Sequence, residues 1–105
     1  MKIISIYNRA GAFAENKDVA RDIRMQDILP TLEKKKEITL DFKGVEAVTQ
    51  SFIHALISDV LRKYGNNCLD YMTFKACNDT VKKIINIVVD YIQEGMESDH
   101  ERKLR

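Results

Sequence analysis

Alternating hydrophobic and polar residues mark three segments of the chain as β-strands. The segments are 2–7, 37–42 and 69–76, and the middle one alternates most regularly. Successive side chains of a strand point to opposite faces, so this alternation places the apolar residues on one face. Isoleucine, threonine, tyrosine and phenylalanine recur in these segments, and such residues favour extended structure. The segment 8–14, with Gly11 at its centre, is rich in turn-forming residues and is expected to form a hairpin or a surface loop.

The segments that follow the strands have the hydrophobic period of α-helices. Asn16 is suited to cap the first helix, which Pro30 is expected to kink or end because proline lacks a backbone donor. The second helix is expected to run from Thr49, whose hydroxyl is suited to cap it, to Tyr64. Gly65-Asn66-Asn67 is expected to stop it there, because these residues suit a left-handed turn.

A third helix is expected after Asn78 or Asp79, either of which can cap it. Strands alternate with helices along the whole chain, and this order favours a sheet with helices packed on it. We therefore expect one α/β domain with a mixed sheet of about four strands and packed helices. The domain is expected to span residues 1–95, and the charged segment 96–105 is expected to be a flexible tail.

The helix expected after Thr49 carries an apolar stripe and a polar stripe on different sides. The apolar residues fall on one side at helical spacing and are expected to face the sheet; they are Phe52, Ile53, Leu56, Ile57, Val60, Leu61 and Tyr64. The polar residues follow one another at intervals of three, four and four positions; they are Ser51, His54, Ser58 and Arg62. Residues at these intervals are neighbours on a helix, so the polar stripe is expected to face outward.

Ser51 has two interpretations. It lies in the first turn of the expected helix, where a serine often serves only as a surface residue or a cap. The first turn also tolerates negative charge, so an exposed hydroxyl there is a candidate phosphate acceptor. His54 follows Ser51 by three positions, but no acid or oxyanion-stabilising motif accompanies the pair, so we expect no catalysis.

The segment from Leu40 to Phe52 resembles a known family. The residues that carry the resemblance are Leu40-Asp41-Phe42, Gly44-Val45 and Val48-Thr49-Gln50-Ser51-Phe52. They resemble the STAS-like family, which is described as a domain of unknown function, and more distantly the STAS domains of anti-sigma factor antagonists. The antagonists have Asp, Ser and Gly-Leu where this chain has Thr49, Gln50 and Phe52-Ile53, so the likeness to the STAS-like family is the stronger one.

The resemblance implies a function and a set of site residues. In the antagonists, a partner kinase with the GHKL ATPase fold phosphorylates the serine that corresponds to Ser51. By this analogy Ser51 is the candidate phospho-acceptor, and a GHKL-type ATPase or kinase is the candidate partner. The candidate partner-binding surface consists of the neighbouring loop and stripe residues Gly44, Thr49, Gln50, His54, Ser58 and Arg62.

Composition and charge exclude several other classes of function. The chain has 105 residues, of which 45% are hydrophobic and 31% charged, and this balance is typical of a globular domain. Its formal net charge of +1 provides no field that attracts nucleic acid or an anionic membrane.

The apolar run at the start is too short for an export signal or a membrane span, so a cytoplasmic protein is expected. The spacing of Cys68 and Cys77 matches no metal or redox motif, and we expect neither metal nor cofactor.

Two hypotheses on function remain open at this point. The first is a small regulatory module that binds a protein partner, with Ser51 as a phosphorylation-controlled switch. The second is a structural or scaffolding subunit of a multiprotein complex, in which Ser51 has no regulatory role. The sequence does not indicate the oligomeric state.

Overall fold

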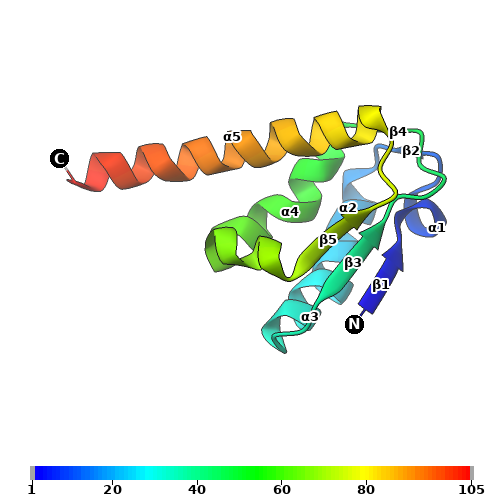
Figure 1. Ribbon diagram of the computed structural model, residues 1–105, viewed down its shortest axis with the longest axis horizontal. Helices are drawn as coiled ribbons and strands as arrows, with labels where there is room; N and C mark the ends of the chain where they lie inside the picture. Colours follow the sequence, from blue (N-terminus) through cyan, green and yellow to red (C-terminus); the bar gives the residue numbers. More distant parts are fainter. Residues whose placement is uncertain (1, 105) are drawn as a thin grey trace.

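The computed structural model describes the backbone of residues 2–104 and the side chains of residues 2–65 and 67–95. Figure 1 shows the helices and strands, which follow one another in this order: β1 (Lys2–Ser5), α1 (Ile6–Ala10), β2 (Phe13–Ala14), α2 (Lys17–Ile23), the π-helical segment η1 (Arg24–Ile28), α3 (Leu29–Glu33), β3 (Ile38–Asp41), β4 (Ala47–Val48), α4 (Gln50–Tyr64), the 3₁₀ segment η2 (Gly65–Asp70), β5 (Met72–Lys75) and α5 (Asp79–Leu104).

The central sheet has three strands that all run in the same direction. The order across the sheet is β1-β3-β5, with Lys2 paired with Ile38 and Ile38 paired with Met72. A second, two-stranded parallel sheet joins β2 to β4. The prediction of a single mixed sheet of about four strands is therefore wrong in strand number and direction. The physical reason is that helices cross between β1, β3 and β5, and such crossovers return the chain to the same end of the sheet.

The segment after β1 forms neither of the two structures that its turn-forming residues predicted. Ser5 caps a short helix, because its hydroxyl oxygen accepts a 3.1 Å hydrogen bond from the backbone N–H of Asn8. Gly11 ends this helix with a φ of 82°, which favours glycine over other residues. Strand β2 then pairs with β4 rather than folding back on β1.

Pro30 does not end the helix that begins after Asn16. The chain stays helical from α2 through η1 into α3, and a π-helical turn precedes the proline. In that turn the N–H of Leu29 bonds to the carbonyl of Arg24. The hydroxyl of Thr31 donates a 2.6 Å hydrogen bond to the carbonyl of Asp27, which helps to satisfy the backbone where the regular ladder is interrupted.

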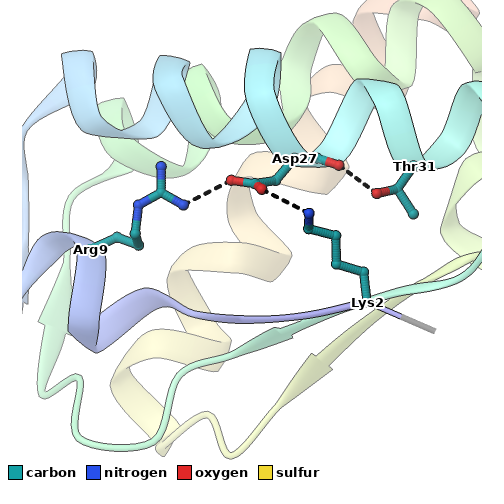
Figure 2. Close-up of polar contacts among 4 residues, drawn as sticks. All are labelled: Lys2, Arg9, Asp27 and Thr31. Atoms are coloured by element: carbon teal, nitrogen blue, oxygen red, sulfur yellow. Dashed lines mark hydrogen bonds and ion pairs between the residues drawn. The ribbon is translucent and has the colours of Figure 1, made fainter.

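Asp27 joins three elements at this point. Its carboxylate lies 2.8 Å from Nη1 of Arg9 on α1 and 3.2 Å from Nζ of Lys2 on β1, as Figure 2 shows. Burial raises the pKa of the Asp27 carboxyl. The hydrogen bonds and positive charges of Arg9 and Lys2 lower this pKa by more than burial raises it, so the net pKa lies below the ordinary value. The ion pairs therefore stabilise the packing of η1 against β1 and α1.

Helix α4 lies at the centre of the hydrophobic core. Its apolar residues are almost fully buried, as the sequence predicted, and Tyr64 at its end is half-buried. Both α2 and α5 pack on α4, and buried residues of β3 complete the core. Figure 1 shows α5 crossing over α4 and running on to the C-terminal end of the chain. In the described part of the chain, no helix is long and apolar enough to cross a membrane.

Helix α5 continues beyond the boundary expected at residue 95. Asn78 caps it, since its Oδ1 atom accepts a 2.8 Å bond from the N–H of Val81. The expected flexible tail, residues 96–105, overlaps this helix, which runs to Leu104. The side chains of that segment lie outside the described residues, so its separation from the domain stays a prediction.

Candidate functional site

Thr49 begins α4 and leaves Ser51 exposed in the first helical turn. The backbone N–H of Phe52 donates a 3.0 Å hydrogen bond to Oγ1 of Thr49, whose backbone is extended. This is the arrangement of an N-cap, as the sequence predicted. No hydrogen bond of the Ser51 hydroxyl is found among the described residues. Ser51 is thus accessible at a helix N-terminus, where unpaired N–H groups favour negative charge.

A surface groove of about 430 Å³ lies beside Ser51, between α4, α5 and the start of α2. We call it the α4/α5 groove, and its lining residues are Lys17, Gln50, Ser51, His54, Ala55, Ile87, Val88 and Tyr91. The structure therefore brings together three predicted site residues: Gln50, Ser51 and His54. It adds residues from α2 and α5 that the sequence reasoning did not include.

The α5 side of the groove exposes apolar surface. Tyr91 is 67% exposed and Ile87 is 40% exposed, whereas the adjoining Val88 is buried. Large apolar side chains that lie together on the surface often mark a binding site. The helical period of α5 could have indicated this exposed surface. Ile87 and Tyr91 fall outside the buried stripe of the helix, which is formed by residues such as Ile85 and Val88.

Lys17 is the charged side chain among the described residues that line the groove. It is exposed at the first position of α2, which Asn16 caps through a 2.9 Å bond from the N–H of Asp18. His54 is half-buried on the α4 side, one helical turn after Ser51. Among the described residues, no Asp or Glu lines the groove.

Ser58 does not belong to the exposed surface, which corrects the prediction of one outward polar stripe. Its side chain is 4% exposed. The amphipathic pattern predicted a helix covered on one side, but α2 and α5 both pack on α4 and leave only a narrow exposed strip. Arg24 of η1 contributes to this cover, with Nη1 bonded to the carbonyl of Ala55 at 2.8 Å and paired with Asp59 at 3.2 Å. Arg62 is exposed but does not line the groove.

Gly44 lines a different cavity from Ser51. This cavity of about 600 Å³ lies where β1 and β3 end, and its lining residues are Tyr7, Ala12, Phe42, Lys43, Gly44, Val45, Glu46, Ala76 and Asn78. Gly44 has a φ of 90°, a conformation that favours glycine over other residues. Of the residues predicted for the partner surface, Gly44 thus lines one hollow and Gln50 and His54 line the other. Thr49, Ser58 and Arg62 line neither.

The remaining polar candidates have structural roles. Oδ1 of Asp41 accepts a 3.0 Å hydrogen bond from the N–H of Lys43, so this carboxylate holds the loop after β3. Cys68 is buried and Cys77 is half-buried, and burial raises the pKa of both thiols. Within the described ranges, no three His, Cys, Asp or Glu side chains are grouped so that they could hold a metal ion.

Comparison with known proteins identifies the family. A family model described as the STAS-like domain of unknown function (DUF4325) matches residues 25–82. No curated protein and no solved structure matches the chain. The matched segment runs from η1 into the start of α5 and includes all of α4 with Ser51. It covers more than half of the 105 residues, and the chain therefore belongs to the STAS-like family.

Proposed function

We propose that this protein is a regulatory module that binds a protein partner at the α4/α5 groove. The observation that carries the proposal is the exposure of Ile87 and Tyr91 directly beside the accessible Ser51. Apolar side chains in such a position provide binding energy when a partner covers them, and aromatic residues contribute more than most. Membership of the STAS-like family supports an interaction module in preference to an enzyme.

Ser51 is the proposed switch of this module. Phosphorylation adds about −1.5 to −2 charges at neutral pH. The first turn of α4 tolerates this charge, and Lys17 lines the same groove and can pair with it. A partner that contacts Tyr91 would then have to bind next to the strongly hydrated phosphate, so the binding of the partner weakens. The resemblance to anti-sigma factor antagonists supports a GHKL-type ATPase or kinase as the partner that transfers the phosphate.

The first experiment tests phosphorylation. The full chain is incubated with ATP and, one at a time, with each purified GHKL-fold ATPase of the host organism, and the intact mass is measured. One added phosphate is expected on the wild type and none on Ser51→Ala. The proposal of a switch at Ser51 is wrong if the wild type gains no phosphate, or if Ser51→Ala gains as much phosphate as the wild type.

The second experiment tests the groove by calorimetric titration with the ATPase that adds the phosphate. Ser51→Asp and Tyr91→Ala are expected to weaken binding, and Ser51→Ala is expected to retain it. Tyr71→Ala is the matched control, because Tyr71 is also an exposed tyrosine but lies outside the groove. Undiminished binding by Tyr91→Ala would show that the partner binds elsewhere. Undiminished binding by Ser51→Asp would favour the alternative, a scaffolding subunit without a phospho-switch.

A further inference from the structure

Three polar side chains line the α4/α5 groove from two different helices. Ser51 and His54 lie one turn apart on α4, and Lys17 lines the groove from the start of α2, which packs on α4. Residues three positions apart are neighbours on a helix, so the His54 ring and the Ser51 hydroxyl lie on the same side of α4. Within the described part of the chain, none of the three side chains forms a hydrogen bond or an ion pair. All three are therefore available to bind a further group.

The charge inside the groove favours an anion. Lys17 brings a positive charge, and no Asp or Glu is found among the described lining residues. Ser51 lies in the first turn of α4, where backbone N–H groups without helical partners carry partial positive charge. A negative group attached to Ser51 would thus lie between this helix end and the side chain of Lys17.

Several charged residues lie close to the groove without lining it. Those within one helical turn of the lining residues, or just before α2, are Glu15, Asp18, Arg21, Asp59, Lys83, Asp90 and Glu94. All of them are exposed. Asp18 is paired with Arg21 at 3.2 Å, and Asp59 is paired with Arg24 at 3.2 Å. Water and salt screen exposed charges outside the groove, so they act on a group inside it more weakly than Lys17 does.

We infer that the phosphate on Ser51 is held inside the groove by Lys17 and His54. The ammonium group of Lys17 pairs with one phosphate oxygen, and a ring N–H of His54 donates a hydrogen bond to another. The inference deepens the proposed function and rests on it, since phosphorylation of Ser51 is part of that proposal. It adds that the phosphate joins the start of α2 to α4. The phosphate brings about −1.5 to −2 charges, which exceed the single positive charge of Lys17, so the groove becomes negative.

The test is a phosphorus NMR titration of the full chain, with phosphoserine incorporated at position 51 during synthesis. The signal gives the second pKa of the phosphate, which is ordinarily about 6. A positive charge and a hydrogen-bond donor stabilise the doubly charged form. This pKa is therefore expected to lie about 0.5–1 unit lower in the folded protein than in the same chain unfolded in urea.

Variants at two positions identify the cause of this difference. Lys17→Gln should remove most of it, and Lys17→Arg should retain it, because arginine keeps the charge. His54→Ala should remove a smaller part. Lys34→Gln is the matched control, since Lys34 is exposed at the end of α3 and does not line the groove. Urea unfolding provides a second measurement: the phosphate should raise the urea midpoint of the wild type more than that of Lys17→Gln.

Two results would overturn the inference. One is an equal phosphate pKa in the folded and unfolded chains. The other is a pKa difference that survives Lys17→Gln, because the end of α4 alone would then explain it. A difference that survives His54→Ala in full would overturn the role of His54. The titration uses neither a kinase nor a partner, so a failure of the phosphorylation assay leaves it unchanged, and a failed titration leaves that assay unchanged.

Discussion

The N–H of Phe52 bonds to Oγ1 of Thr49 at 3.0 Å, so the capping of α4 depends on Thr49 and not on Ser51. The two hydroxyl residues lie two positions apart at the same helix end. Only the first has a structural partner within the described residues. This division of roles leaves Ser51 free to be modified without loss of the helix start.

Substitution at these two positions is therefore expected to have different effects on stability. Thr49→Ala removes the capping bond and should lower the free energy of unfolding by about 0.5–2 kcal/mol. Ser51→Ala should leave it nearly unchanged. Urea titration followed by circular dichroism measures both. A clear loss of stability in Ser51→Ala would show that its hydroxyl supports the fold.

Two aspartate substitutions compare the exposed serine with the buried one. Ser51→Asp adds a charge at the N-terminus of α4, which is expected to be neutral or to stabilise the protein by up to about 1 kcal/mol. Ser58→Asp places a carboxylate in a site that is 4% exposed. It should lower the free energy of unfolding by about 3 kcal/mol or more, because a buried charge loses its hydration. Equal melting temperatures for the two variants would contradict the burial of Ser58.

The ion pairs of Asp27 predict a dependence of stability on pH. Because Arg9 and Lys2 hold the pKa of the Asp27 carboxyl below its unfolded value of 3.8, the folded state binds this proton more weakly than the unfolded state. The stabilisation is therefore complete above the unfolded pKa and is lost as the pH falls through the folded pKa. Asp27→Asn should lower the free energy of unfolding by about 1–2 kcal/mol at pH 7.

Denaturant titrations from pH 7 to pH 2 measure this difference. The gap between wild type and Asp27→Asn should narrow as the pH falls below about 4. Asp18→Asn is the control, because the ion pair of Asp18 with Arg21 is highly exposed and should contribute little. A gap that does not change with pH would show that Asp27 acts through packing rather than through its charge.

Gly44 lies against the ring of Tyr7, and this contact restricts the glycine. A Cβ atom at position 44 would lie 3.0 Å from Cδ1 of Tyr7, and the backbone there has a φ of 90°. Gly44→Ala should therefore lower the free energy of unfolding by about 1–3 kcal/mol. In the background of Tyr7→Ala the loss should be smaller, since only the backbone strain remains.

Gly95 provides a control of opposite sign for this prediction. It lies within α5, and an added Cβ atom would meet no atom within 4 Å. Gly95→Ala is expected to raise the free energy of unfolding by about 0.5–1 kcal/mol, because alanine is the better helix former. If Gly44→Ala also stabilised the protein, neither the positive φ of Gly44 nor its close contact with Tyr7 would restrict this position.

The hydroxyl of Tyr64 is buried and has no hydrogen-bond partner among the described residues. Its removal in Tyr64→Phe should leave the free energy of unfolding unchanged or raise it by up to about 1 kcal/mol. Tyr91→Phe, at a highly exposed position, is the comparison and should have no effect. A loss of stability in Tyr64→Phe alone would indicate that an ordered water bonds to the hydroxyl.

The sequence by itself determined the features that depend on a few neighbouring residues. Asn16, Thr49 and Asn78 cap their helices as expected, because a side-chain oxygen reaches only backbone groups two or three positions away. The buried face of α4 was also predictable from its helical period. The STAS-like family was recognisable from the strand, loop and helix around Ser51.

Only the tertiary structure decided which surfaces the packed elements share. A helical period shows which side of α4 is apolar, but not how many neighbours cover the rest, so the burial of Ser58 followed from the packing of both α2 and α5. In the same way, Tyr91 lies 40 positions after Ser51 in the sequence yet lines the same groove. Local patterns extend over one or two helical turns, whereas contacts between distant elements depend on how the whole chain packs around its core.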